Sequence, residues 1–404
     1  MSGAKASFVS LAMNLTFDII GAVIMDVDLD AQQLDPLKRG ELVRAFTELL
    51  DAYWNDKIHL SWWFNLSNEL RRRRLGKRVE RSLKSIVRRK HEEQQQGYRE
   101  GQNPQSRSVL SLSLQHTKVL SQCVLDRSCD QLRTFLLGGH DSPSATLAWI
   151  FYELSRSPHV LSAVCAELDS LFGPGTDADA VRAQLASPAG PDLIGRMSYI
   201  TAVIKETLRL HPPASTARYS PHDTGLTIRT LVGEELSLDG VITYNCNFII
   251  HRDPAVYGST AEQFMPERWL QNDSLQTIKD GPNSNPTTAT AHQIPPSAWR
   301  PFERGPRGCI GQEFASIEIR VIIAVVSRQY EFTKVGLGAV ASDASGRPTL
   351  GYDGQYEVKS HVYHVSCYYF FFFMTFLILF FFASLNPLKH GQLTFHRQDT
   401  RDYV

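Results

Sequence analysis

Three glycines surround a single cysteine in the segment Arg300-Pro-Phe-Glu-Arg-Gly-Pro-Arg-Gly-Cys-Ile-Gly-Gln-Glu-Phe314. Gly305, Gly308 and Gly311 predict a tight turn, and the apolar residues that follow at helical spacing predict a helix over residues 311–330. Cys309 then lies at the N-terminus of that helix, where unpaired backbone N–H groups and the helix dipole stabilise a thiolate. Such a sulfur could be a redox nucleophile or a metal ligand, and the plainer alternative is a buried structural cysteine. The residues alone leave these three roles open.

The composition is that of a neutral globular chain. It has 404 residues, 43% of them hydrophobic, and its 42 Lys and Arg residues balance 42 Asp and Glu residues. A net charge of zero gives no whole-protein argument for nucleic-acid binding, and 21% charged with 10% aromatic residues is not typical of a disordered chain. The 6 cysteines include no CxxC pair and are too sparse for a disulfide scaffold or a zinc ribbon. We therefore expect a reducing compartment.

The apolar periodicity predicts an α+β chain that is mainly α-helical. Between Ser215 and Ile250, β-branched and aromatic residues alternate with turn residues and predict short strands. Residues 271–296, rich in Asn, Thr, Ser and Pro, predict an exposed loop. An amphipathic helix is predicted within residues 1–25. Further helices are predicted over residues 31–54, 66–93, 126–155, 158–172, 197–210 and 311–330.

Three other segments combine polar residues with helix or turn signals. Glu206-Thr-Leu-Arg209 places an acid and a base on one face of a helix, and Leu210-His-Pro-Pro213 follows it. Phe264-Met-Pro-Glu-Arg-Trp269 lies downstream. The run Phe135-Leu-Leu-Gly-Gly-His-Asp-Ser-Pro-Ser-Ala-Thr-Leu-Ala-Trp149 is largely apolar, yet its Gly and Pro residues lower the helix propensity in its middle. Taken singly, these segments also fit an ordinary surface ion pair and an apolar core helix.

The spacing Phe302-x-x-Gly305-x-Arg307-x-Cys309-x-Gly311 matches the haem-binding signature of the cytochrome P-450 family, so the chain resembles these haem-thiolate monooxygenases. The resemblance implies haem (iron protoporphyrin IX) as the cofactor and a helical body with small β-sheets. It also implies that Cys309 is the axial ligand of the haem iron. By the same resemblance, Phe302 shields the sulfur, Arg307 and Arg218 bind the haem propionates, and Gly305 and Gly311 let the backbone approach the porphyrin.

The other segments match the family in the same order along the chain. The resemblance implies that Glu206 and Arg209 form a buried network with Arg268 behind the cysteine segment. It also implies that Asp141 and Ser142 relay protons to bound oxygen from the helix that crosses the distal haem face. The family usually has Thr where Ser142 stands. Pro143 comes next and lacks a backbone N–H, so we expect the helix to kink there.

The activity that the resemblance implies is the insertion of one atom of O2 into a small organic substrate, with electrons from an NADPH-dependent reductase. The distal helix and His251-Arg-Asp-Pro254 look most like membrane-bound fungal members that act in secondary metabolism. We therefore expect a membrane protein of the endoplasmic reticulum, with its catalytic domain in the cytosol and no nucleic-acid partner. Two alternatives stay open: an inactive truncated remnant of such an enzyme, and a non-enzymatic, membrane-anchored helical protein that binds a partner.

Both ends of the chain depart from the family's pattern. The family's N-terminal anchor and first helices are not found, so residues 1–366 are interpreted as a monooxygenase domain that is truncated at its N-terminus and incomplete at both ends. Residues 367–385 hold 17 apolar residues in 19 and are a candidate transmembrane segment, and residues 386–404 form a polar tail. The plainer alternative is a buried core helix, and because the run is so rich in Phe, a third reading is translated non-coding DNA.

A basic run covers residues 71–90, where eleven Lys or Arg residues accompany a single acid, Glu80. Apolar residues recur within the run at helical spacing. A solvated helix face is the favoured reading, and attraction to an anionic membrane surface is the alternative.

Overall fold

The computed structural model describes residues 7–54, 66–99, 107–270 and 294–359, apart from residues 176, 231 and 337. Helices dominate these residues, and the named strands form two antiparallel sheets of two strands each. The predicted α+β, mainly helical fold is therefore confirmed. Residues 271–293 of the predicted loop, and the predicted segments 367–385 and 386–404, lie outside the described residues.

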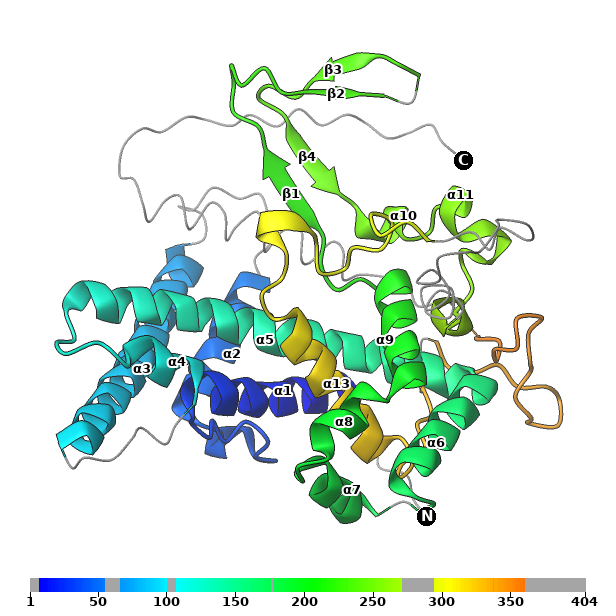
Figure 1. Cartoon of the computed structure of the whole chain (residues 1–404), viewed down its shortest axis with the longest axis horizontal. Helices are drawn as coiled ribbons and strands as arrows, with labels where there is room; N and C mark the ends of the chain where they lie inside the picture. The colour runs from blue at the N-terminus through cyan, green and yellow to red at the C-terminus, as the bar shows by residue number, and fades with distance from the viewer. Residues whose placement is uncertain are drawn as a thin grey trace, which may run out of the picture.

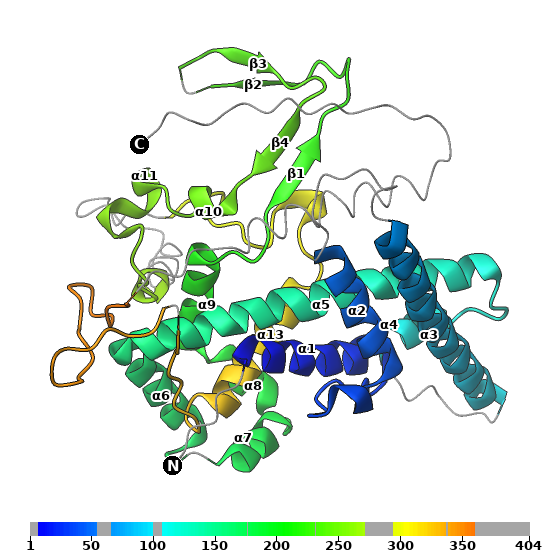
Figure 2. The ribbon, with the colours of Figure 1, turned by 180° about the vertical axis from the view of Figure 1, so that it is seen from behind.

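Helix α5 (Gln122–Arg156) runs through the middle of the molecule, and helix α1 (Phe8–Met25) lies along it (Figures 1 and 2). The hydroxyl of Thr16 donates to the backbone carbonyl of His140 at 2.8 Å. The ring of Phe17 stacks on the ring of His140, with the centroids 4.0 Å apart. Both contacts fix α1 to the middle of α5. The remaining helices of this half are α2 (Glu41–Trp54), α3 (Leu66–Arg99) and α4 (Val109–Leu114).

Among the described residues, α1 is the one helix that is long and apolar enough to cross a membrane by length and composition. One of its faces is buried: Phe17 and Ile20 are 2% and 4% exposed and pack into the core beside α5. The opposite face is open, since Leu11 is 52% exposed. Packing against α5 thus accounts for the apolar residues of one face of α1.

A second apolar core lies around the C-terminal half of α5. Ile150 of α5, Val203 of α9 and Ile323 of α13 are fully buried within it. These helices turn their apolar faces toward one another, which closes the core between them. The elements of this half are α6 (Pro158–Phe172), α7 (Ala178–Leu185), α8 (Gly190–Gly195), α9 (Ser198–Leu210), α10 (Asn247–Ile250), α11 (Pro254–Tyr257) and α13 (Gln312–Val326).

The strands extend away from the helices as a ribbon (Figure 1). Strand β1 (Thr216–Tyr219) pairs antiparallel with β4 (Ile242–Asn245), and Thr216 lies opposite Asn245. Strand β2 (Thr227–Arg229) pairs in the same way with β3 (Glu235–Ser237) at the outer end of the ribbon. All four strands fall within the range predicted from the sequence.

The predicted helix boundaries hold for some elements and are wrong for others. The helix predicted over residues 31–54 begins only at Glu41. Pro36 starts a short 3-10 turn before it, and the carboxylate of Asp35 caps that turn by accepting from the N–H of Leu37 at 3.0 Å. Proline at such a position starts a turn and disfavours a helix that would run through it. The helix predicted over residues 311–330 ends earlier, at Val326.

Pro143 lies inside α5, which is helical without a break from Gln122 to Arg156. The missing N–H of a proline leaves the carbonyl four residues earlier, here on Gly139, without its helical donor. The helix continues on both sides of this point and keeps Asp141 and Ser142 within one turn. Pro143 therefore does not end helix α5.

Candidate functional site

The cysteine loop, residues 300–311, folds back on itself before it enters α13. The backbone N–H of Cys309 donates to the carbonyl of Phe302 at 2.8 Å, and the N–H of Gly308 donates to the carbonyl of Gly305 at 2.9 Å. Gly305 has φ 72°, a left-handed conformation that glycine adopts at little cost. Gly311 precedes the first residue of α13 and is its N-cap. The predicted tight turn before a helix is present.

The outer side of this loop is open. Cys309 is exposed, and Ile310 beside it is 90% exposed. A Cβ atom built on Gly311 would lie 3.9 Å from the Cys309 sulfur, and one built on Gly305 would meet no atom within 4 Å. This excludes the buried structural cysteine among the three roles considered for Cys309. The roles of redox nucleophile and metal ligand remain. An exposed thiol next to an exposed apolar side chain suits a flat apolar group that covers both.

Two further residues predicted for the site, Arg307 and Arg218, are exposed on the cysteine loop and on β1. Arg218 donates from Nη1 to the carbonyl of Ala217 at 3.0 Å. Within the described part of the chain, neither guanidinium forms an ion pair. Both charges are therefore available to an anionic group. The ring of Phe302 is half-buried and packs near Trp299, with the centroids 6.3 Å apart.

Glu206, Arg209 and Arg268 meet in a buried network behind the loop. Arg209 Nη2 lies 2.8 Å from Glu206 Oε1, and Arg268 Nε lies 2.9 Å from the same oxygen. The indole N–H of Trp269 donates to Glu206 Oε2 at 2.9 Å. Glu206 and Arg209 are fully buried, and a buried charge pair is stable only when hydrogen bonds of this kind satisfy it. The structure brings all three predicted network residues together.

His251 connects this network to the cysteine loop. Its carbonyl accepts from Arg209 Nη1 at 2.9 Å, and its Nε2 accepts from the backbone N–H of Arg300 at 3.0 Å. Burial lowers the pKa of His251 to about 4, which keeps the ring neutral and its Nε2 lone pair free to accept. No role for this residue could be predicted from the sequence, although it stands in the quoted His251-Arg-Asp-Pro254 segment. The role of His251 becomes apparent only from its contacts with Arg209 in the buried network and Arg300 in the cysteine loop.

Asp141 and Ser142 are half-buried neighbours in the middle of α5. Burial raises the pKa of the Asp141 carboxyl above its ordinary value. The hydroxyl of Ser142 donates to the carbonyl of Gly138 at 2.8 Å. Phe314, in the first turn of α13, packs against the core cluster that contains Leu132 and Leu136 of α5. The cysteine loop therefore leads into a helix that contacts α5.

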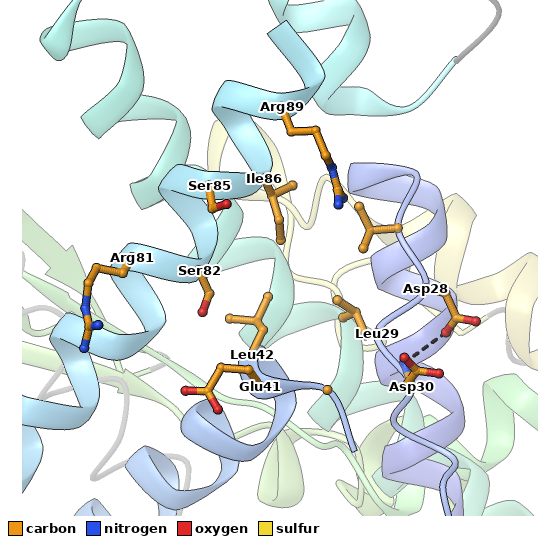
Figure 3. A pocket seen from close by; sticks show the side chains of 12 residues that line it. Asp28, Leu29, Asp30, Glu41, Leu42, Arg81, Ser82, Ser85, Ile86 and Arg89 are labelled. Atoms are coloured by element: carbon orange, nitrogen blue, oxygen red, sulfur yellow. Dashed lines mark hydrogen bonds between the residues drawn. The ribbon is translucent and has the colours of Figure 1, made fainter. Parts of the chain in front are cut away.

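A cavity of about 410 Å³ lies elsewhere, between α3 and the loop that joins α1 to α2 (Figure 3). Its charged lining includes Arg81 and Arg89 on α3 and Asp28, Asp30 and Glu41 on the other side. None of the site residues predicted from the sequence lines it. This cavity is separate from the cysteine loop.

The family model described as Cytochrome P450 matches residues 3–341. The chain belongs to the cytochrome P450 family. This membership confirms the resemblance on which the site residues were predicted.

Several relatives are similar to the chain. The cytochrome P450 monooxygenase acrF of Aspergillus aculeatus is 32% identical over 331 residues, which cover 80% of this chain and 62% of that protein. The cytochrome P450 monooxygenase polC of Polytolypa hystricis is 34% identical over 50% of this chain and 32% of its own length. A bifunctional cytochrome P450/NADPH–P450 reductase of Gibberella moniliformis is 31% identical over 58% of this chain and 18% of that protein. The chain thus spans less than two thirds of the length of these relatives.

Cytochrome P450 proteins bind haem, and the residues present here fit that group. The fit rests on the donor set: an exposed thiol at the start of α13, an exposed isoleucine beside it, and two guanidiniums without an ion pair among the described residues. Thiolate is the iron ligand of this family, and guanidinium groups suit the carboxylates of a porphyrin. Cys309, Arg307 and Arg218 are therefore the residues that would hold haem.

Proposed function

We propose that this chain is a haem-thiolate monooxygenase that inserts one atom of O2 into a small organic substrate, with Cys309 as the residue that would hold the haem iron. The main support for the proposal is the exposed Cys309, which lies just before the first residue of α13. Its backbone N–H donates a hydrogen bond to the carbonyl of Phe302. When haem is bound there, it supplies the activation of O2 and the transfer of oxygen. The protein supplies the ligand, the pocket and the protons.

The residues of the loop each have a defined task in this proposal. Cys309 provides the sulfur, and the half-buried ring of Phe302 would shield that sulfur from water. Gly305 and Gly311 leave no side chain between the backbone and the porphyrin. Arg307 and Arg218 neutralise the two propionates. Glu206, Arg209 and Arg268 hold the loop from behind through His251 and Arg300.

Asp141 and Ser142 would hold and move the protons that the activation of O2 consumes. The raised pKa of Asp141 means that its carboxyl holds a proton at a higher pH than an ordinary aspartate does. Such a group can donate a proton and take another from solvent. The Ser142 hydroxyl donates to Gly138, so its oxygen keeps lone pairs that accept a hydrogen bond from a neighbouring proton donor.

The partners and the location follow the same proposal. An NADPH-dependent reductase would supply electrons, and relatives named as fused P450/NADPH–P450 reductases support this partner. The similarity to monooxygenases of Aspergillus aculeatus and Polytolypa hystricis supports a role in fungal secondary-metabolite biosynthesis. We place the protein at the endoplasmic reticulum membrane with its catalytic domain in the cytosol. The apolar run of residues 367–385 supports membrane association.

The first test is a carbon monoxide difference spectrum of the reduced full-length chain, expressed in membranes, beside the variant Cys309→Ala. A strongly red-shifted Soret band in the wild type and its loss in the variant are expected, because the shift requires the thiolate ligand. Absence of haem from well-folded wild-type protein would overturn the proposal and favour the non-enzymatic, partner-binding alternative. Haem binding without turnover, in the presence of a reductase and a panel of substrates, would favour the inactive remnant.

A further inference from the structure

Glu303 is a charged residue in a backbone conformation that usually belongs to glycine. It lies next to Phe302 in the cysteine loop and has φ 55°. A residue with a side chain adopts this left-handed region only when its surroundings over-determine it, and such residues cluster at functional sites. Its side chain is only 9% exposed. Contacts of this buried side chain therefore hold the backbone conformation.

The carboxylate of Glu303 joins two separate parts of the fold. Oε2 accepts from Nη2 of Arg300 in the same loop at 2.7 Å. Oε1 accepts from the hydroxyl of Thr216 on β1, a short contact, and from Nδ2 of Asn245 on β4 at 3.4 Å. Thr216 and Asn245 are cross-strand partners at the inner end of the ribbon. Glu303 thus ties the cysteine loop to both strands at once.

The charge of Glu303 suits this bridging position. Burial acts to raise the pKa of the carboxyl, but the hydrogen bonds from Thr216 and Arg300 outweigh burial, and the pKa lies below its ordinary value. An ionised carboxylate accepts at both oxygens, and charge-assisted bonds of this kind are stronger than neutral ones.

The two parts that Glu303 joins are the two that would hold haem. The loop carries Cys309 and Arg307, and β1 carries Arg218 two residues beyond Thr216. Arg300, the third partner, donates its backbone N–H to His251 and so reaches the buried Glu206 network. Among the described residues, no other carboxylate contacts both the loop and the ribbon.

We propose that Glu303 is a positioning residue that fixes the cysteine loop against strand β1, and thereby sets the placement of Cys309 relative to Arg218. The inference rests on the proposed function, since both residues matter only if haem is held between them. The left-handed conformation of Glu303 is then part of the haem site, because this turn of the backbone lets the carboxylate reach Thr216 and Asn245 on the ribbon.

The test compares Glu303→Gly and Thr216→Val with the wild type. Glycine accepts the left-handed backbone, so this variant removes the carboxylate without adding strain. Valine removes the hydroxyl of Thr216 at similar volume. The readouts are the rate of haem loss to an excess of apomyoglobin and the fraction of reduced, CO-bound protein with the red-shifted Soret band. Each is normalised to haem content.

Each variant is expected to lose haem about tenfold faster than the wild type, which corresponds to one hydrogen bond to a charged group. Part of the Soret band should also move to shorter wavelength. The double variant should be no worse than the stronger single one, because both remove the same contact. Glu303→Gln still accepts from Thr216 and is expected to lie between Glu303→Gly and the wild type.

Glu167→Gln is the matched control. Glu167 accepts from the Ser198 hydroxyl and from the N–H groups of Tyr199 and Ile200, at 3.1, 2.7 and 2.9 Å. This variant therefore also removes a carboxylate that accepts from three donors. This variant should melt at a lower temperature and keep the haem-loss rate and the spectrum of the wild type. Haem loss and spectra unchanged in Glu303→Gly would overturn the inference while the proposed function stands. A wild type without haem would overturn both.

Discussion

At the scale of single residues, Glu206 is the shared acceptor of the buried network behind the cysteine loop. It is fully buried and accepts from Arg209, Arg268, Trp269 and the backbone N–H of Met265. Glu206→Gln leaves two buried guanidiniums without their counter-charge, and breaking a buried pair in this way costs about 3–5 kcal/mol. We expect this loss in the free energy of unfolding, measured by urea denaturation.

Glu69→Gln is the control for that measurement. Glu69 pairs with Arg73 at 2.9 Å on the surface of α3, and exposed pairs of this kind contribute less than about 1 kcal/mol. Equal losses in the two variants would show that the buried network does not stabilise the fold more than a surface pair does.

The sequence could predict some residues of the candidate site and not others. Glu206, Arg209 and Arg268 stand in recognisable motifs, and the structure brings them together. Glu303 and His251 could not be given roles, because their partners lie far away in the sequence: Thr216 is 87 positions from Glu303, and Arg300 is 49 positions from His251. Pairings across such separations depend on tertiary packing, which no local pattern encodes.

At the scale of secondary-structure elements, the packing of α1 on α5 leads to a second prediction. Phe17 is 2% exposed and stacks on His140. Phe17→Ala removes a buried aromatic ring and is expected to cost about 3–5 kcal/mol of unfolding free energy. Leu11→Ala lies on the same helix at a 52% exposed position and should change the stability by less than about 0.5 kcal/mol. Similar effects of the two variants would show that this face of α1 is not packed against α5.

The elements that the sequence predicted best have clear stops at both ends. Helix α6 matches its predicted range, because Pro158 starts it and Gly173 ends it. The helix predicted from residue 31 was wrong by ten residues, since the apolar spacing continues across Pro36 while the backbone does not. Pro143 is the opposite case, because α5 continues through it. Packing on both sides of α5 holds a helix that local propensity would weaken.

At the scale of the whole molecule, the sequence could predict the fold class and the order of the elements but not their contacts. The bond from Thr16 to His140 spans 124 positions, and the cysteine loop meets the β1–β4 ribbon across 87. Both contacts join segments that are unremarkable in isolation. The candidate site therefore forms only when the chain folds, and its stability should respond to substitutions of residues that lie outside the site.

Buried titratable groups link the stability of the whole molecule to pH. Glu318 on α13 is 6% exposed, and neither of its carboxyl oxygens has a hydrogen-bond partner among the described residues. Burial raises its pKa from 4.5 to about 8. Because the folded-state pKa lies above the unfolded one, the stability that Glu318 contributes is complete below about pH 4.5 and is lost as the pH rises through about 8.

His140 and His251 act in the opposite direction and mainly at lower pH. Burial lowers the pKa of each from 6.5 to about 4, so the stability they contribute is complete above about pH 6.5 and is lost as the pH falls through about 4. Between about pH 6.5 and 8, Glu318 is therefore the group among these three that still changes the stability.

Glu318→Gln should remove that change, since the amide cannot ionise. Its free energy of unfolding relative to the wild type is expected to rise between pH 6.5 and 8 by up to about 1.4 kcal/mol per pH unit, because over this range the wild-type carboxyl is ionised in the unfolded chain and still protonated in the folded one, whereas the amide ionises in neither. Urea denaturation at a series of pH values measures this difference. Glu313→Gln, an exposed position on the same helix, should give a curve parallel to that of the wild type. A parallel curve for Glu318→Gln as well would mean that Glu318 has an ordinary pKa in the folded chain, with water or another group satisfying its carboxylate.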